Sequence, residues 1–580
     1  MIVSFLRERK EVLIKATLFI LIAFFFIGRA LNGIEPYPCG DGPEYIMTTE
    51  AVYNHFTPDI RLTDIQSFRN SYYARNRWHF EKTYFDNLGS LLTREHKFMD
   101  GKGGVFIDKW GRSYAFHFFS YSMLNVPGRF IAEKTGGNPL IAFQVTNGIF
   151  VILTCFILLF FSPFALGKTI LFVLSFCFSS IFWYLGWPHP EVLTASLVTL
   201  AFWYFFREKY YTAILLVALA GLQNQPLLVI LVFMGIKTLI VKGVNLKNIL
   251  KIGACSALFV WPPLFYFVHF HTTNLIKDAG FLDKNFITFT RVLGFYFDPN
   301  QGLILAVPLV LLLYIFLIGR KWTLVLRRRE KFDFNYLLPF FLIAMTCIVS
   351  MMVFWNHGQA VVNRYVSWFS AIILVHTFFL VVNLRELVSY IVLNYIFVTQ
   401  LFTTLYHQQF NHYDWGQNSH KPLAKFLLDM HPSWYNPDPT IFIIRTTHDY
   451  DCDPEVSPVF YLRDRIITNK IAVHKDKLDG LLGYGISKTE LDRLKPKLHF
   501  ISNWAYINRG EFCSSMNGAD IYAMLRARKV KAFADRIRSH PGWLKQVQEK
   551  AAGWGISTEA AIAKDAEYLM WLEENQNEVH

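Results

Sequence analysis

Three carboxylates stand at the borders of long apolar segments, and they are the candidates for acid–base chemistry. Asp41 and Glu44 lie three residues apart in Gly40-Asp41-Gly42-Pro43-Glu44-Tyr45, and Glu191 ends the polar run Trp187-Pro188-His189-Pro190-Glu191. A carboxylate held against a hydroxyl group can take its proton while a new bond to the oxygen forms. Capping of a following helix is the ordinary alternative for Asp41 and for Glu191.

Three cationic or titratable residues in similar positions could bind a phosphate. Arg364 leads directly into an apolar segment, Arg291 opens an aromatic stretch, and His117 lies in another such stretch. A guanidinium group binds phosphate through paired donors, so Arg364 is the leading candidate and the other two are secondary. For Arg29 and Arg129 we favour a simpler interpretation, in which the side chain reaches a lipid phosphate at the membrane surface.

The elements that must position these residues are membrane helices. Of the 580 residues, 53% are hydrophobic and only 17% are charged, whereas a soluble chain carries about 25% charged residues. A bilayer core of about 30 Å needs roughly 20 apolar residues per helix. Eleven segments qualify by this criterion: 12–31, 141–162, 169–186, 191–206, 211–224, 226–241, 250–268, 302–318, 336–354, 366–382 and 387–405. The first is interpreted as an anchor rather than a cleaved signal peptide, because Arg29 interrupts its end.

Charge then predicts the orientation. With the N-terminus inside, the inner loops hold 18 Lys and Arg residues against 6 acidic residues, which is a net +12 of the chain's +13. The basic balance is therefore the positive-inside pattern and not a nucleic-acid footprint. These inner loops are 1–15, 163–168, 207–210, 237–251, 319–333 and 383–386.

Two regions are too polar for lipid, and both fall outside. The first external loop, 34–140, contains an apparent surface helix at 114–131, which could alternatively be a true span. The tail, 406–580, is long enough for its own core. Strands are predicted at 441–445, 459–462, 498–507 and 520–525, followed by helix over 528–575 with a break at 553–556. We thus expect a membrane module at 1–405 and an external α/β domain at 406–580.

External cysteines and aromatic residues give two further expectations. Cys452 and Cys513 should pair in an oxidising compartment, while Cys39 stays free. The aromatic residues of the first loop could stack on a sugar or pack on a lipid chain, although such residues more often seat a surface helix in the interface. They are Tyr72, Tyr73, Trp78, Phe80, Tyr84 and Phe85.

The predicted orientation places all the reactive candidates on the outer face, as expected if they line one reaction centre. They are Asp41, Glu44, His117, His189, Glu191, Arg291, Asp298 and Arg364.

The order of these motifs resembles the GT-C superfamily of integral-membrane glycosyltransferases, which use sugars linked to polyprenyl phosphate. Its members include protein mannosyltransferases and the aminoarabinose transferases of lipid A. The similar elements are Gly40-Asp41 with Tyr45, Tyr114 with His117 and Pro127, His189-Pro190-Glu191, Phe297-Asp298-Pro299-Asn300-Gln301-Gly302-Leu303, and Asn363-Arg364-Tyr365. The resemblance covers about 1–405 and implies the GT-C fold.

The resemblance implies an inverting transfer of a single sugar to an acceptor hydroxyl on the outer face, with Asp41 as general base and Glu44 and Glu191 as further catalytic residues. Arg364, with His117 and Arg291, would bind the donor phosphate, and substrate contacts are assigned to His189, Asp298, Asn363 and Tyr365. The second external loop lacks an Asp-x-Asp motif, so we expect no cofactor or metal. The expected partners are the polyprenyl-phosphate sugar, a glycan, lipid or protein acceptor, and the bilayer, without nucleic acid.

Alternatives remain open at this point. An O-antigen ligase or polymerase is also polytopic and has a large outer loop, but it would not need the acidic pair after the first segment. A transporter would place ionisable residues deep in several spans, and a non-catalytic scaffold would leave the one-sided cluster unexplained. Short loops and few external cysteines favour a bacterial inner membrane, with the N-terminus cytoplasmic and the C-terminus periplasmic.

Overall fold

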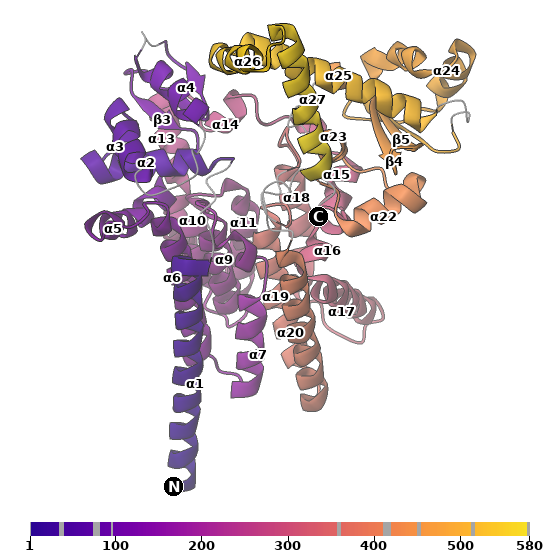
Figure 1. Cartoon of the computed structure of the whole chain (residues 1–580). Coiled ribbons are helices and arrows are strands. Elements are labelled where there is room, and N and C mark those ends of the chain that lie inside the picture. Colours follow the sequence, from indigo (N-terminus) through magenta and orange to yellow (C-terminus); the bar gives the residue numbers. More distant parts are fainter. Residues whose placement is uncertain are drawn as a thin grey trace. The chain divides into compact units, whose positions relative to one another are not determined.

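The computed structural model describes residues 2–33, 40–73, 82–93, 97–356, 361–409, 419–448, 454–511 and 517–576. The chain forms two compact units, residues 1–421 and 422–580, each with its own hydrophobic core (Figure 1). The three cysteines of the predicted external set, Cys39, Cys452 and Cys513, lie outside the described residues.

Six apolar helical segments in the first unit are long enough to cross a bilayer, counted over the described residues. They fit a helical membrane protein. The segments are α1 (Ile2–Gly28), α6 (Ile141–Phe160), η2 with α11 (Gln225–Leu227 and Leu228–Lys242), α12 with η3 and α13 (Leu246–Ser256, Ala257–Val260 and Trp261–Phe270), α17 (Pro308–Leu326) and α20 (Glu386–Gln408).

Five shorter apolar helices occupy the other five predicted segments. They are α7 (Leu166–Cys177), α9 (Glu191–Phe205), α10 (Tyr210–Gly221), η5 with α18 (Phe334–Leu337 and Leu338–Val349) and α19 (Val366–Val382). Their length alone does not establish a crossing, so the total of eleven spans stays a prediction. Two of them, α9 and α19, form the centre of the unit, since α9 packs against α6, α10 and α19 and nearly all its side chains are buried.

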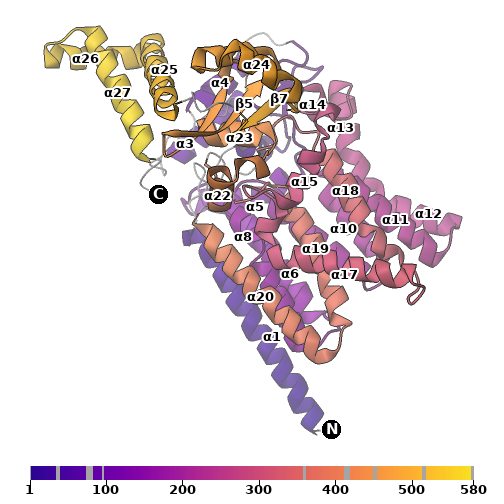
Figure 2. The same ribbon diagram turned by 90° about the vertical axis from the view of Figure 1, so that its right-hand side faces the viewer.

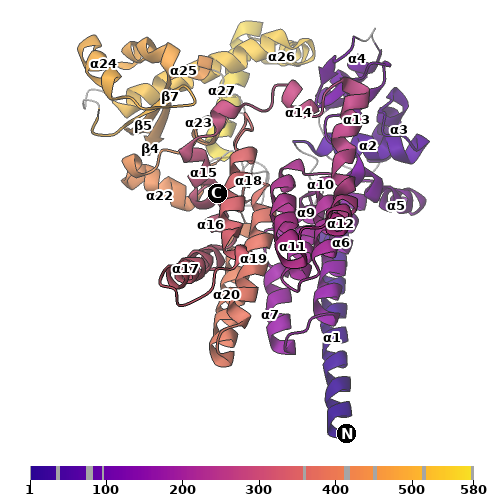
Figure 3. The ribbon, with the colours of Figure 1, turned by 180° about the vertical axis from the view of Figure 1, so that it is seen from behind.

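The other apolar helices surround this centre. Helices α10, α11 and α12 lie side by side, and the N-terminal end of α1 projects past the rest of the unit (Figures 2 and 3). Few of the α1 side chains that the structure describes are buried, as expected for a helix that faces lipid.

The region predicted as the first external loop is a small folded layer whose core it shares with α6 and α9. Tyr45, Phe68, Phe85 and Val105 are among the buried residues of this core. η1 (Arg29–Gly33) precedes the region, whose elements are α2 (Gly42–His55), α3 (Leu62–Tyr73), α4 (Lys82–Thr93), α5 (Ser120–Lys134), and an antiparallel sheet of β1 (Gly101–Lys102), β2 (Val105–Ile107) and β3 (Ser113–Ala115).

The prediction of one helix over 114–131 is wrong in its first part. Tyr114 and Ala115 belong to β3, where they pair with Phe106 and Val105, and the helix starts only at Ser120. Aromatic residues satisfy both a strand and a surface helix, and pairing with β2 decides between them.

Four short elements connect the later apolar helices. They are α14 (Leu275–Asp278), η4 (Lys284–Phe286), α15 (Phe289–Phe297) and α16 (Leu303–Ala306). A turn at 298–302 joins the last two, and Gly302 is required there because a Cβ atom would collide with the backbone of Asp298.

The second unit contains an antiparallel sheet in the order β4-β5-β7-β6, formed by Val459–Arg463, Ile467–His474, Trp504–Asn508 and Phe500–Ile501. Its helices are α22 (Pro422–Met430), η6 (Pro432–Trp434), α23 (Pro439–Thr447), η7 (Pro454–Val456), η8 (Lys475–Tyr484), α24 (Lys488–Leu494), η9 (Lys495–Lys497), α25 (Gly518–Ser539), α26 (Pro541–Trp554) and α27 (Thr558–Gln576).

Two of the four strands predicted in this unit are wrong. Residues 441–445 lie in α23, because the Asp438 side chain accepts a bond from the Thr440 N–H and Pro439 favours the first helical turn. Residues 520–525 lie in α25, which Asn517 caps. The strand near 459–462 and the helix break at 553–556 are confirmed. The single strand predicted at 498–507 is instead an antiparallel pair, β6 and β7, and the predicted helix has a second break at His540. Strand β5 was not predicted.

Candidate active site

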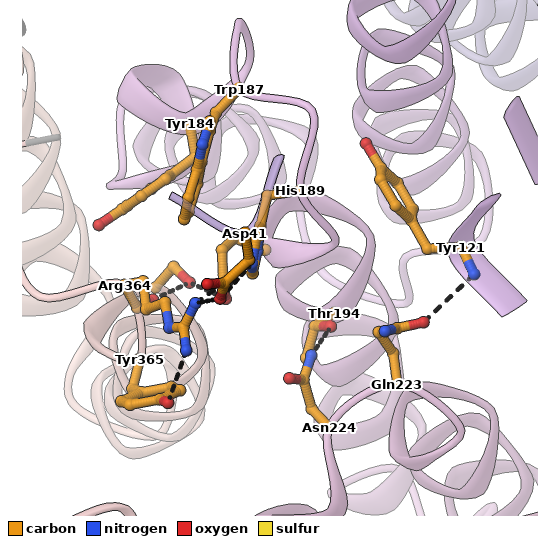
Figure 4. Close-up of polar contacts among 12 residues, drawn as sticks. Asp41, Tyr121, Tyr184, Trp187, His189, Thr194, Gln223, Asn224, Arg364 and Tyr365 are labelled. Carbon is orange, nitrogen blue, oxygen red and sulfur yellow. Dashed lines mark hydrogen bonds and ion pairs between the residues drawn. The ribbon is translucent and has the colours of Figure 1, made fainter. Parts of the chain in front are cut away.

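An ion pair between Asp41 and Arg364 lies at the centre of the site (Figure 4). Arg364 Nη1 donates to Asp41 Oδ2 across 323 residues of sequence. Asp41 precedes α2, but its side chain makes no capping bond to that helix. Capping therefore does not explain this carboxylate, which points instead at the arginine before α19.

The segment before α19 holds Arg364 in place. Arg364 Nη2 donates to the Tyr365 hydroxyl at 3.0 Å, and the Asn363 side chain accepts from the Tyr365 N–H at 3.1 Å. The Asn363 N–H in turn donates to the Gln301 carbonyl at 2.9 Å. Arg364 is 6% exposed, and its Nε is buried without a hydrogen-bond partner. Asn363 and Tyr365, predicted to bind substrate, thus support the arginine in this structure.

Two histidines flank the ion pair from different elements. His189 Nε2 lies 3.5 Å from Asp41 Oδ2 and 3.3 Å from Arg364 Nη1, and its ring stacks on Trp187 at 3.9 Å. His117 Nε2 lies 3.6 Å from the same carboxylate oxygen. The structure therefore brings both predicted histidines to Asp41.

Glu44 lies behind His117 and is buried. His117 Nδ1 is 3.0 Å from Glu44 Oε2. The Glu44 carboxyl lies directly against Gly104. The φ angle of Gly104 is +76°, and a Cβ atom at this position would overlap Glu44 and Phe116. A glycine is required at this turn for both reasons.

Glu191 joins the site to α19. Its Oε2 accepts bonds from Trp368 Nε1 and, at 3.4 Å, from the Ser367 hydroxyl. Its Oε1 lies 3.1 Å from His189 Nδ1, within ion-pair distance, yet both atoms lack hydrogen-bond geometry. The contacts of Glu191 thus cross to another helix instead of capping α9.

The protonation states follow from burial and from the central ion pair. Burial alone would raise the pKa of Asp41, but the charge of Arg364, with contacts from His117 and His189, holds that pKa well below its usual range. Burial and the neighbouring Asp41 charge raise the pKa of Glu44 well above its usual range. Burial lowers the pKa of His117 to about 3. At neutral pH Asp41 is therefore ionised beside a neutral His117, and Glu44 holds its proton more strongly than a free carboxyl group.

Polar residues within apolar helices support this cluster. Asn147 of α6 donates to the carbonyls of Leu185 and Trp187 at 3.2 and 3.1 Å, and it accepts from the Tyr121 hydroxyl at 2.9 Å. Gln223 donates to the Tyr45 hydroxyl at 3.0 Å and accepts from the Tyr121 N–H (Figure 4). Tyr45 itself packs on both histidine rings. Sequence reasoning missed Asn147, Tyr121 and Gln223, although an Asn or Gln inside an apolar run is the signal that could have identified two of them.

Arg291 and Asp298 both bind backbone groups. Arg291 is fully buried and donates to the carbonyls of Ser350, Met352 and Val353, so it fastens α15 to the end of α18. Asp298 accepts from the N–H groups of Asn300 and Gln301 at 2.7 and 3.2 Å and shapes the turn after α15. These contacts hold backbone groups and account for the burial of both side chains.

Two expectations for the first loop need correction. Tyr72 and Phe85 are buried in its core, so they are not free to stack on a sugar. Arg129 does not reach for lipid, because it is 1% exposed and forms a paired contact with both oxygens of Glu50. Trp78 and Phe80 lie outside the described residues, as do the side chains of Tyr73 and Tyr84.

Arg29 lies over the ring of Phe182 at 3.9 Å. This contact packs the end of α1 against α8 (Ile181–Tyr184).

Among the described residues, no group of three or more His, Cys, Asp or Glu side chains is arranged to hold a metal ion. No protein family, curated protein or solved structure matches the chain in the comparisons. The function therefore has to be proposed from the site itself.

Proposed function

We propose that this protein is a membrane glycosyltransferase that moves one sugar from a polyprenyl-phosphate carrier to an acceptor hydroxyl. The observation that carries the proposal is the buried Arg364–Asp41 pair with His117 and His189 on the same carboxylate. It combines a cation suited to a phosphate leaving group with a carboxylate suited to a hydroxyl proton. The order of the surrounding motifs resembles the GT-C superfamily, and we extend the proposal to that fold with eleven spans.

The chemistry assigns one role to each charged group. The bond between the sugar C1 and the phosphate oxygen breaks while the acceptor oxygen bonds to C1 from the opposite face. The acceptor proton goes to Asp41, and the polyprenyl phosphate leaves as an anion held by Arg364. Positive charge at a departing phosphate stabilises the transition state directly.

The ion pair also supports a way to switch on the base. Without substrate, Arg364 keeps the pKa of Asp41 low, which makes the carboxylate a weak proton acceptor. A carrier phosphate that engages Arg364 would share its charge, so the pKa of Asp41 would rise when the donor is bound. Neutral His117 would contact the carboxylate without adding charge, and the raised pKa of Glu44 would reduce the negative charge next to it.

Both substrates would then reach the site from the outer face of the membrane. The net +12 of the predicted inner loops supports this orientation, with the N-terminus cytoplasmic and the 422–580 unit outside. Reporter fusions after Thr404 and after Lys331 test it, because the first should be active outside and the second inside. An inactive external reporter after Thr404 would remove the shared face on which the proposal depends.

The activity itself is tested with purified protein in lipid nanodiscs and a panel of polyprenyl-phosphate monosaccharides. Release of polyprenyl phosphate in the presence of a cell-envelope extract as acceptor is the measured product. We expect one donor to be consumed by the wild type and not by Asp41→Asn. The matched control is Asp86→Asn, which changes an exposed carboxylate of the same loop. Equal donor consumption by both variants would refute the proposal.

A further inference from the structure

A cavity of about 290 Å³ lies at the opposite ends of the helices that carry the candidate active site. Helix α9 begins with Glu191 in that site, and its C-cap residue, Phe206, lines the cavity. Helix α19 follows Arg364 directly and brings Phe379 and Leu380 to the cavity near its end. Helices of 15 and 17 residues span about 22 and 26 Å. The two sites are therefore separated by most of a bilayer.

Several basic loops converge on this cavity. Arg320 and Lys321, near the end of α17, line it together with Asp333 from the following loop and Asn383 after α19. The neighbouring Lys237 of α11 donates to Asp333 at 2.7 Å. These residues belong to the loops with the concentrated positive charge. The cavity is thus built where the protein is most basic.

The charges around the cavity are not balanced within the protein. Lys321 forms an ion pair with Glu330 at 2.7 Å, and Lys237 forms one with Asp333 at 2.7 Å. Both nearby acids are therefore engaged. Arg320 lines the cavity with an exposed side chain, and its charge acts on Glu330, but it forms no ion pair or hydrogen bond with any part of the chain that the structure describes. One guanidinium group is left to face an anion from outside the protein.

Asn335 and His376 complete the wall of the cavity. Asn335 Nδ2 donates to Asp333 Oδ2 at 3.2 Å, and Asn335 Oδ1 is enclosed by protein atoms, so this side chain holds the loop in place. His376, stacked on Phe206 at 4.7 Å, adds an aromatic surface. The cavity therefore offers a cation for a phosphate beside apolar and aromatic side chains.

We propose that this cavity binds a phosphate ester head group, with Arg320 as its counter-charge. A volume near the lower end of ligand pockets suits a head group and not a larger ligand. Basic pockets between membrane helices are common sites for anionic lipid head groups. The site is independent of the glycosyl transfer, because it shares no residue with the Arg364–Asp41 cluster.

The test compares lipid binding by the full-length protein in nanodiscs of phosphatidylcholine, with and without phosphatidylglycerol. Native mass spectrometry measures how much phosphatidylglycerol stays bound. We expect Arg320→Gln to weaken this binding about tenfold, since a hydrogen bond to a charged group is lost. Arg328→Gln is the matched control, because it removes the same charge from the same loop without lining the cavity. A second variant, Leu324→Trp, fills the cavity at constant charge and should also reduce binding.

A soluble source of the same chemistry is tested separately with glycerol 3-phosphate added to phosphatidylcholine nanodiscs. If it raises the thermal midpoint of the wild type but not of Arg320→Gln, the site takes a free phosphate ester. If only phosphatidylglycerol has this effect, the ligand is the lipid. Equal losses for Arg320→Gln and Arg328→Gln, or no preference for phosphatidylglycerol in the wild type, would overturn the proposal.

Discussion

Replacing Asp41 with asparagine separates the catalytic and structural contributions of the central ion pair. Asparagine keeps the size and one oxygen but accepts no proton, so transfer should fall by about 10² to 10⁴. The substitution also leaves Arg364 without its carboxylate. Removing one partner of a fully buried pair costs about 3–5 kcal/mol, and an exposed pair contributes about 0–1 kcal/mol.

The side chains of Arg364 and Asp41 are 7% and 24% exposed, which places this pair between those limits. We expect Asp41→Asn to lose about 1–3 kcal/mol of stability. The loss arises from the unpaired guanidinium and not from a missing helix cap, because the Asp41 side chain makes no capping bond. A guanidinium released from Asp41 remains available to phosphate, so carrier binding should be retained.

The assay measures transfer, carrier binding and thermal unfolding on the same nanodisc preparations. Arg364→Gln should lose carrier binding, whereas Asp41→Asn should lose transfer and keep carrier binding. In the double variant the stability losses should fall short of additive, since neither charge is left uncompensated. Transfer near the wild-type rate by Asp41→Asn would refute the general-base assignment, and fully additive stability losses would refute the energetic role of the pair.

Three further predictions concern the surroundings of the pair. Gly104→Ala should lower both stability and activity, because the new methyl group overlaps Glu44 at a positive φ; unchanged thermal midpoints and rates would contradict this. For His117, a folded-state pKa of about 3 against 6.5 in the unfolded chain means that stability is lost as pH falls from about 6.5 towards 3. His117→Gln should therefore reduce the fall in thermal midpoint between about pH 6.5 and pH 3, and an unchanged fall would contradict the lowered pKa of His117. Arg129→Ala should cost about 3–5 kcal/mol by leaving Glu50 buried and unpaired, as measured by denaturant unfolding, and a loss under 1 kcal/mol would contradict it.

The apolar segments and the charged neighbours of Asp41 were the parts most open to prediction. Each predicted segment contains an apolar helix, since long apolar runs leave little alternative. Asp41, His117, His189, Glu191 and Arg364 were each singled out locally, and the structure brings them into one cluster. The predicted membrane orientation was enough to group these residues, because charged residues gather at helix ends and these ends are predicted to share one face of the membrane.

Other features depend on contacts that no local pattern contains. Nothing around Arg291 distinguishes an arginine that binds phosphate from one that fastens three backbone carbonyls. Arg129 was assigned to the lipid surface because its partner, Glu50, lies 79 residues away in sequence. In the second unit, the apolar run in α23 is buried on all sides, so it shows neither strand nor helix periodicity.

The 323 residues between Asp41 and Arg364 also set an order of events during synthesis. At roughly 5–20 residues per second, Asp41 leaves the ribosome about 16 to 65 seconds before Arg364. Through that interval the layer of α2 to α5 can fold together with α6 and α9 while Asp41 still lacks Arg364 as its counter-ion. The candidate site is therefore completed only when the segment before α19 arrives, so a chain truncated before residue 364 should carry this layer without the Arg364–Asp41 pair.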